Sequence, residues 1–338
     1  MLPSFRMKRE FNALLFAVLL FVGIGYVNPV FLTVRNIALT LQGSVMYIFL
    51  AAGMTFVILT GDIDVSVGAV LGMSAAVAAT LVRDGYSLWA VVGGALLVGG
   101  GTGLLNGVGV TFLRIPAIVM TLGTMGILRG AMFIYTDGKW VENLPDFFKQ
   151  ACQICVYGVN LFVLAAIAVV LVMQLYLSTA RRGKYFAAVG DNLDGAVLVG
   201  VPVVRIRIAA FVISGLCSAL AGLVYTSQIG FVGNVAGNGT EMTAIAACVI
   251  GGVSLAGGTG SVAGALFGAV IMNTINSALV FLKVPAYWNN TISGLLLLTM
   301  VLADSLLHRY LEEKARRKRL NARFARAAER RACDDARA

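Results

Sequence analysis

Nearly uncharged hydrophobic runs alternate with short polar segments along the whole chain. The runs cover 11–27, 37–60, 65–82, 88–110, 117–135, 157–180, 206–227, the stretch 242–282, and 290–302 with its continuation to 307. The stretch 242–282 is too long for one helix, and Gly257-Gly258-Thr259-Gly260 divides it into two. Because about 20 apolar residues cross the hydrocarbon core of a bilayer as a helix, the pattern predicts an all-α polytopic membrane protein with about ten transmembrane helices.

The composition supports this class. Of the 338 residues, 59% are hydrophobic and 12% are charged, whereas soluble domains are about 45–50% apolar and about 25% charged. So little polar surface cannot cover a water-facing globule, which excludes an ordinary soluble enzyme, a disordered protein and a nucleic-acid-binding domain. The 39 glycines suit helices that approach closely in lipid, where small residues permit tight packing.

The charge pattern predicts the orientation. Residues 309–338 carry eleven basic and five acidic side chains, which is typical either of a tail that binds nucleic acid or an acidic partner, or of a cytoplasmic tail. The second interpretation is favoured because the tail directly follows a hydrophobic run. With ten spans, 20 basic residues lie on the side of the termini and five on the other side. The positive-inside bias then predicts a transmembrane domain over 1–308, a basic tail over 309–338, and both termini in the cytoplasm.

Two polar segments interrupt the runs. Residues 136–155 include Trp140, Phe147 and Phe148, and we expect this segment to lie at the membrane interface. The longest internal polar loop is 181–205. In it, Asn192 can cap a short helix over 193–199, Gly200 fits the position after its end, and Pro202 stops it. The loop predicts a short docking helix on the cytoplasmic face, or otherwise an ordinary structured loop.

The chain has few residues suited to catalysis. No GxxxxGK[ST] segment is present, so we expect no phosphate-binding loop and ATP hydrolysis only on a separate partner. His308 is the one histidine, and we expect no metal site and no cofactor. A disulfide or redox role for Cys152 and Cys155 stays open. The acids Asp62, Asp64, Glu241 and Asp304 fall at the ends of predicted spans, which argues against a proton-coupled carrier.

Uncharged amides and one arginine are the candidates for a translocation path. Arg129 stands about two turns inside its span, where it either extends to the outer interface or faces a hydrophilic passage. Asn106, Asn273 and Asn276 either join helices by hydrogen bonds or contact a solute. The segment 112–117 (FLRIPA) resembles 281–286 (FLKVPA). These segments fall on opposite faces of the membrane, as two inverted repeats would place them, unless the recurrence is by chance.

Four motifs carry a resemblance to a known family. They are GDIDVSVG at 61–68, TLGT at 121–124 followed by Arg129-Gly130, AVGDN at 188–192 followed by Ala196 and Gly200, and GGVSLAGGTGS at 251–261. Over nearly its whole length the chain resembles the permease subunits of bacterial ATP-binding-cassette importers for ribose and related sugars. Segments 126–145, 191–193 and 227–231 resemble the autoinducer-2 branch of that family most.

The resemblance implies a multi-subunit importer in the bacterial inner membrane. Its partners would be a second permease subunit, identical or related, two ATP-binding subunits and a periplasmic substrate-binding protein. The solute would be small and polyhydroxylated, autoinducer-2 first and ribose or another monosaccharide second; a stand-alone sugar carrier is the remaining alternative. The residues implied in coupling to the ATPase are Gly190, Asn192, Ala196, Gly200 and Pro202. Ala187 and Val197 stand where family members often have arginine, which puts individual salt links to the ATPase in doubt.

Overall fold

The computed structural model describes residues 3–281 and isolated positions from 283 to 302. Its elements are α1 (Pro3–Val27), the 3-10 helix η1 (Pro29–Leu32), α2 (Val34–Leu59), α3 (Val67–Arg83), α4 (Leu88–Thr111), α5 (Ala117–Tyr135), α6 (Asp146–Ala151), β1 (Cys155–Val156), β2 (Val159–Asn160), α7 (Leu161–Thr179), α8 (Arg181–Asp191), α9 (Leu193–Leu198), α10 (Val203–Ile229), α11 (Thr240–Ile250) and α12 (Val262–Phe281). The chain divides into two compact units, Met1–Leu297 and Leu298–Ala338, and the arrangement below is that of the first. Most of the predicted tenth span and all of the tail 309–338 lie outside the described residues.

Among the described residues, six helices are long and apolar enough to cross a membrane, namely α2, α4, α5, α7, α10 and α12. Three shorter apolar helices accompany them: Ala13–Tyr26 within α1, α3 and α11. Each of these nine helices overlaps one of the first nine predicted spans, with the stretch 242–282 counted as two. The all-helical membrane class is therefore confirmed, whereas the number of ten spans and the inverted repeats stay predictions.

Local sequence signals start several of these helices. The side chains of Thr33, Ser87 and Asn160 accept hydrogen bonds from the backbone N–H groups two or three residues later, at the first turns of α2, α4 and α7. A side-chain oxygen at this position satisfies a backbone donor that the helix itself cannot pair. In a bilayer that pairing matters more, because no water is present to replace it.

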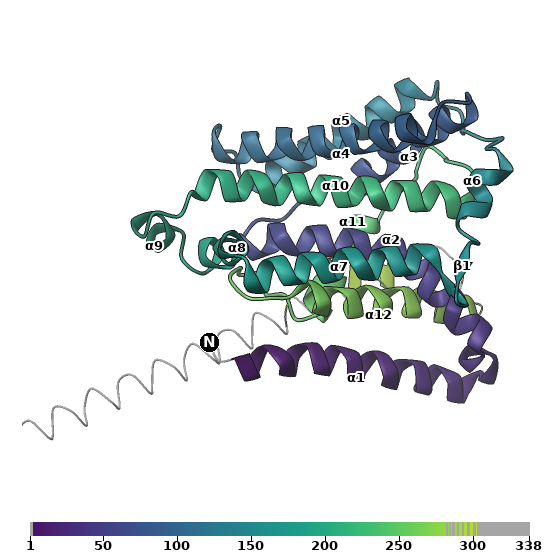
Figure 1. Ribbon diagram of the computed structural model, residues 1–338, viewed down its shortest axis with the longest axis horizontal. Helices are drawn as coiled ribbons and strands as arrows, with labels where there is room; N and C mark the ends of the chain where they lie inside the picture. The colour runs from purple at the N-terminus through teal and green to yellow at the C-terminus, as the bar shows by residue number, and fades with distance from the viewer. Residues whose placement is uncertain are drawn as a thin grey trace, which may run out of the picture. The chain divides into compact units, whose positions relative to one another are not determined.

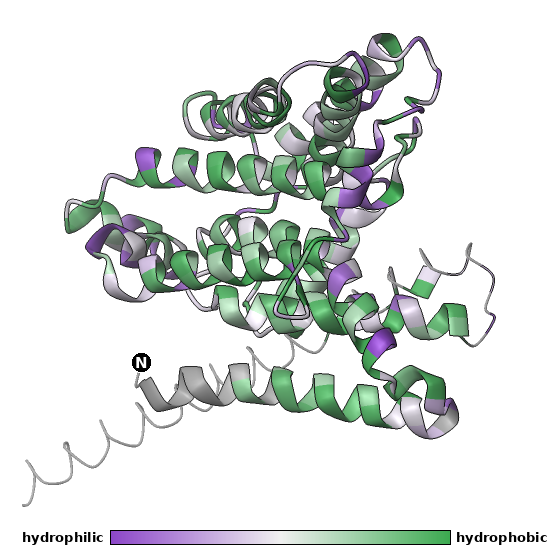
Figure 2. Ribbon diagram, turned by 45° about the vertical axis from the view of Figure 1, so that its right-hand side comes forward, coloured by the Kyte–Doolittle hydropathy of each residue, from purple (hydrophilic) through white to green (hydrophobic). Residues whose placement is uncertain are grey.

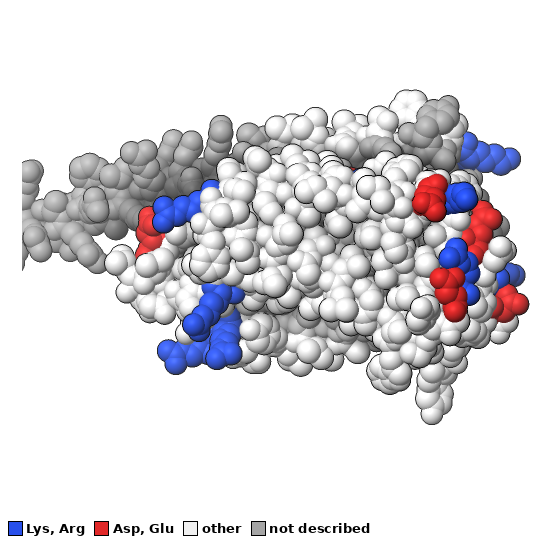
Figure 3. All heavy atoms as spheres, turned by 90° about the horizontal axis from the view of Figure 1, so that it is seen from above, with Lys and Arg blue, Asp and Glu red and all other residues white. Residues whose placement is uncertain are grey.

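Charged side chains gather at two ends of the described unit, with an uncharged belt between them (Figure 3). One end carries α8 and α9 and is called the α9 end; the other carries α6 and the β1–β2 hairpin and is called the α6 end (Figure 1). The helices between are predominantly hydrophobic (Figure 2). Leu97, Ile127 and Ile134 in this belt are 77%, 71% and 81% exposed, as expected of side chains that face lipid hydrocarbon rather than water.

The helix α10 packs at the centre of the bundle against α2, α3 and α4. Glycines permit its contact with α4, since a Cβ atom at Gly99 would collide with the carbonyl of Gly215, and one at Gly215 with the carbonyl of Gly99. Such close backbone approach increases the van der Waals contact that holds helices together in lipid.

Two segments enter the bundle interior without forming helix. Residues 60–66 connect α2 to α3, and residues 230–239 connect α10 to α11. The second segment begins beside Val141, which pairs with Val232 near α6, and reaches the start of α3, where a Cβ atom on Gly68 would collide with the carbonyl of Gly237. The short helix α11 spans about 16 Å at 1.5 Å per residue, roughly half of a bilayer core.

The course of segments 60–66 and 230–239 through the interior corrects one inference from the sequence. Asp64 and Glu241 fall at the ends of predicted spans in the sequence, yet both side chains are buried inside the bundle, with exposed fractions of 1% and 7%. Ser214, which bonds to Asp64, lies eleven residues into α10, about 16 Å from the helix start. The interior of this protein therefore does contain acidic groups.

The break before α12 is also longer than predicted. The helix α11 ends at Ile250, ahead of the predicted break at Gly257–Gly260, and residues 251–261 are irregular. Gly252, Gly257 and Gly258 have φ angles of +86°, +86° and +74°. Residues with side chains rarely adopt such angles, so Gly252 favours the end of α11 at Ile250, and Gly257 and Gly258 form the turn that follows.

Candidate functional site

The predicted docking helix is present as α9 at the α9 end. The Asn192 side-chain oxygen accepts from the backbone N–H of Gly195 at 2.8 Å, which caps the first turn. At the other end Gly200 adopts a φ of +79°, and the N–H of Val201 donates to the carbonyl of Ala196 at 2.9 Å. This is the Schellman arrangement that glycine favours after a helix, and it ends α9 one residue before the predicted boundary.

The helix α8, which precedes α9, was not predicted. Its buried residues Gly183, Phe186 and Val189 recur every three positions, a helical spacing that marks one face of the segment. The ring of Phe186 packs edge-on against Phe56 of α2, with ring centroids 5.1 Å apart. The spacing is present in the sequence, but the basic residues of this segment led to its prediction as a loop.

Gly190 joins α8 to two other elements. A Cβ atom there would collide with the carbonyl of Leu59 at the end of α2 and would lie 2.6 Å from the backbone nitrogen of Gly258. The N–H of Gly258 in turn donates to the same Leu59 carbonyl at 3.1 Å. Three segments far apart in sequence therefore meet through the backbones of Leu59, Gly190 and Gly258. This contact is called the glycine joint, and it leaves no room for a side chain at position 190.

The predicted coupling residues thus lie together at the α9 end. Gly190 is in the glycine joint, Asn192 and Gly200 delimit α9, Ala196 is buried beneath it, and Pro202 precedes α10. The outer side of α9 is apolar and open: Leu198 is 86% exposed and Val199 is 79% exposed. Exposed apolar side chains at a charged end mark a surface suited to another protein.

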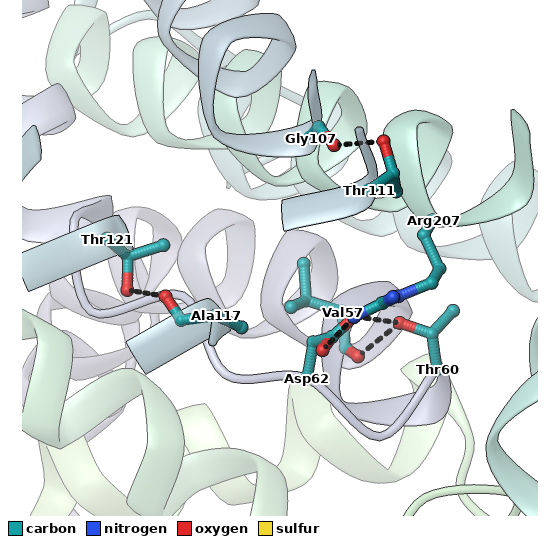
Figure 4. A network of polar contacts seen from close by, with 8 residues as sticks. All are labelled: Val57, Thr60, Asp62, Gly107, Thr111, Ala117, Thr121 and Arg207. Atoms are coloured by element: carbon teal, nitrogen blue, oxygen red, sulfur yellow. Dashed lines mark hydrogen bonds and ion pairs between the residues drawn. The ribbon is translucent and has the colours of Figure 1, made fainter. Parts of the chain in front are cut away.

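An ion pair ties the segment 60–66 to α10 near this surface. The guanidinium of Arg207 donates from Nε to Asp62 Oδ2 at 2.8 Å and from Nη2 to Asp62 Oδ1 at 2.7 Å (Figure 4). Thr60 donates to the same carboxylate at 3.4 Å. A two-bonded arginine–carboxylate contact fixes both distance and orientation, so α10, which directly follows α9, is held to the end of α2.

Deeper in the bundle, a chain of polar side chains connects the segment 60–66 to α4, α5 and α10. The Asp64 carboxylate accepts from the N–H and hydroxyl of Ser66 at 3.0 and 2.6 Å and from the hydroxyl of Ser214 at 2.9 Å. The Asn106 amide donates to Ser66 Oγ at 2.9 Å and accepts from Thr124 at 2.6 Å. In this conformation Asn106 therefore joins helices.

Arg129 turns toward the interior segment 230–239. Its Nη1 atom donates to the carbonyl of Ala236 at 2.6 Å, while its Nη2 atom is sealed from solvent and has no hydrogen-bond partner among the described residues. Glu241 shares this property: Oε1 accepts from the N–H of Gly239 at 3.2 Å, and the sealed Oε2 has no partner in the described part of the chain. Sequence reasoning missed Glu241 as a candidate, because it treated the residue as lying at a span end.

The other two candidate amides lie elsewhere. Asn273 donates to the carbonyl of Thr40 on α2 at 2.8 Å, and Asn276 bonds with Tyr47 on the same helix. They join α12 to α2 and are not in hydrogen-bond contact with Asn106 or Arg129. The four candidates therefore do not form one site in this conformation.

The α6 end is polar and carries the CxxC pair. Cys152 and Cys155 are both free, and their sulfur atoms donate to the carbonyls of Lys149 and Gln153 at 3.0 and 3.5 Å. A hydrogen bond from Lys149 to Asp146 lowers the pKa of that exposed carboxyl. The described residues contain no cluster of histidine, cysteine and acidic groups that could hold a metal ion.

Comparison with known proteins adds two findings. The family described as "Branched-chain amino acid transport system / permease component" matches residues 36–301. The chain is 45% identical over 324 residues to "Autoinducer 2 import system permease protein LsrC" of Escherichia coli O9:H4 (strain HS), over 96% of this chain and 94% of that relative. The relative of the same name from Salmonella typhi is 43% identical over 96% of this chain and 93% of its own length. No solved structure matches the chain.

Proposed function

Since this chain belongs to the permease family of ATP-binding-cassette importers, we propose that it forms part of the membrane path that imports autoinducer-2. A permease component is a transport subunit and not an enzyme, and it works with ATP-binding and substrate-binding partners. The proposed solute is that of the relatives named autoinducer-2 import permeases, which resemble the chain over nearly its full length. We propose that a second, related permease completes the path in the inner membrane.

The glycine joint is the observation that carries the proposed coupling. An ATP-binding subunit bound to the exposed Leu198 and Val199 would push on α9. Gly190 would pass this displacement to the end of α2 and to the glycine turn that precedes α12. The Asp62–Arg207 ion pair would make α10 move together with the end of α2. Rigid-body movement of packed helices about such contacts is one established way of switching between two states.

The two interior segments support the proposed inverted repeats. Residues 60–66 follow α2 and precede α3, and residues 230–239 follow α10 and precede α11. The start of α3 contacts the end of segment 230–239 through Gly68 and Gly237. Two interrupted helices that meet inside the membrane are typical of transport folds built from inverted repeats. Together with these repeats we propose ten spans and both termini on the cytoplasmic side.

Uptake by the reconstituted importer tests the function. The purified complex with its ATP-binding subunits is placed in vesicles with the substrate-binding protein, and uptake of autoinducer-2, ribose and leucine is compared with and without ATP. We expect ATP-dependent uptake of autoinducer-2. Preferential uptake of leucine or ribose would refute the proposed solute, and uptake against a gradient by the chain alone would refute the importer mechanism.

The docking surface can be tested by one exposed residue. Leu198→Glu places a charge in the apolar outer side of α9, where it would be desolvated by a bound partner. We expect the amount of ATP-binding subunit that copurifies to fall about tenfold, because a change at a central contact of an interface weakens binding by about 1–3 kcal/mol. Tyr157→Glu, at a fully exposed position of the β1–β2 turn, is the matched control and should leave copurification unchanged. Equal copurification of both variants with the wild type would exclude α9 as the docking surface.

A further inference from the structure

Arg129 and Glu241 carry opposite charges inside the bundle without bonding to each other. Both side chains bind the same segment 230–239, Arg129 at Ala236 and Glu241 at Gly239, yet no ion pair joins them among the contacts of the described residues. Arg129 Nη2 and Glu241 Oε2 are both sealed from solvent and lack hydrogen-bond partners there. Buried polar atoms are ordinarily paired, so unpaired atoms on two neighbouring charged groups require an explanation.

The position of these groups points to the transport path. Arg129 comes from α5, and Glu241 from the first turn of α11, where segment 230–239 meets the start of α3. A Cβ atom on Gly68 would collide with Glu241 Oε2, so the glycine at the start of α3 leaves space for the carboxylate. Arg129 also holds the carbonyl of Ala236. Movement of segment 230–239 would therefore expose both unpaired atoms together.

The chemistry of the two atoms defines the ligand. A guanidinium N–H needs an acceptor, and an ionised carboxylate oxygen needs a donor. A hydroxyl group supplies both, so neighbouring hydroxyls on one neutral molecule can satisfy Arg129 and Glu241 at the same time. An anion would be repelled by Glu241 and a cation by Arg129. We propose that Arg129 and Glu241 form a hydroxyl-binding subsite for a neutral polyhydroxylated solute inside the membrane path. This proposal rests on the proposed function, because it assigns the solute class to the same path.

Local structure alone does not account for the pair. Glu241 in the first turn of α11 stabilises the helix dipole, and its Oε1 atom reaches back to the N–H of Gly239. That role uses one carboxylate oxygen and leaves the other unpaired. Likewise, a single bond to Ala236 uses only one of the terminal nitrogens of the guanidinium. The second atom of each group is the one available to a ligand.

The test compares solutes that differ by one hydroxyl. The complete importer in vesicles takes up autoinducer-2 or ribose, whichever the wild type transports, and monodeoxy analogues of that solute in the same assay. We expect the wild type to prefer the parent solute over at least one analogue. In Glu241→Gln this preference should fall about tenfold, because a charge-assisted hydrogen bond is replaced by a weaker one. Arg129→Lys should reduce the preference for a deoxy analogue as well, since lysine lacks the second terminal nitrogen.

Two measurements separate this proposal from loss of folding and from failure of the proposed function. Copurification of the ATP-binding subunit and elution of the complex as one peak in size-exclusion chromatography report assembly, and both should match the wild type. Asp84→Asn, at an exposed carboxylate near the α6 end, is the control variant and should keep the wild-type preference. If the wild type transports no polyhydroxylated solute, the proposed function fails. If it does and Glu241→Gln retains the full preference, the subsite alone is refuted. If Glu241→Gln does not assemble, unchanged preference in Arg129→Lys refutes it.

Discussion

At the scale of single residues, the buried carboxylate of Asp64 contributes more to the stability of the protein than the exposed charges do. Asp64 accepts three hydrogen bonds from Ser66 and Ser214 and is almost fully buried. Hydrogen bonds of this kind offset the cost of burying a carboxylate. By contrast, Asp84 pairs with the adjacent Arg83 at the surface, where an ion pair contributes little.

Replacing Asp64 by asparagine should therefore destabilise the protein. Asp64→Asn replaces a charged acceptor by a neutral amide and one acceptor oxygen by an NH2 group, so the hydrogen bonds from Ser66 and Ser214 weaken, which costs about 2 kcal/mol. We expect the apparent melting temperature of the detergent-purified protein to fall by several degrees. The control Asp84→Asn should shift it by less than the error of the measurement. A melting temperature unchanged in Asp64→Asn would contradict the pairing described for this carboxylate.

At the scale of elements, local signals located α9 but not its contacts. Asn192 and Gly200 mark its two ends through rules that involve only neighbouring residues, so the sequence predicted the helix to within one residue. The glycine joint depends on Leu59, Gly190 and Gly258, which are far apart along the chain. No periodicity links such positions, and each glycine by itself indicates only a turn or a close approach.

A methyl group at the joint tests its role. Gly190→Ala would force α8 away from the carbonyl of Leu59, and overpacking of this kind costs about 1–3 kcal/mol. We expect less solute taken up per ATP hydrolysed by the reconstituted importer, because displacement of α9 is no longer passed to α2.

Gly101→Ala is the matched control. Gly101 lies in α4 with open space around the position of a Cβ atom, where alanine is at least as favourable as glycine in a helix. Its ratio of uptake to ATP hydrolysis should equal that of the wild type. A normal ratio in Gly190→Ala would show that the joint does not transmit the movement.

At the scale of the whole chain, the charged ends and the uncharged belt fit a protein that crosses the membrane (Figure 3). The proposed orientation places the α9 end in the cytoplasm and the α6 end outside. Cys155 is exposed in the β1 strand at the α6 end, whereas Cys152, Cys217 and Cys248 are buried. The tail cysteine, Cys333, lies outside the described residues and in the predicted cytoplasmic tail.

Labelling of intact spheroplasts with a membrane-impermeant maleimide tests this orientation. We expect modification of the wild type at Cys155 and none in Cys155→Ser, because the remaining thiols are buried or on the inner side. In a Cys155→Ser background, Leu198→Cys should react only after the membrane is permeabilised. Reaction of Leu198→Cys in intact spheroplasts would place α9 outside and overturn the proposed docking of the ATP-binding subunit.

The sequence by itself determined the membrane class, the positions of the first nine apolar helices and the capped helix α9. These features depend on hydrophobic run length and on hydrogen bonds between close neighbours, both of which are local. Only the tertiary structure decided the depth of Asp64 and Glu241, the helix α8, the glycine joint and the partner of Arg129. Those features depend on how the non-helical segments 60–66, 230–239 and 251–261 turn, and their course is set by contacts between residues distant in the chain.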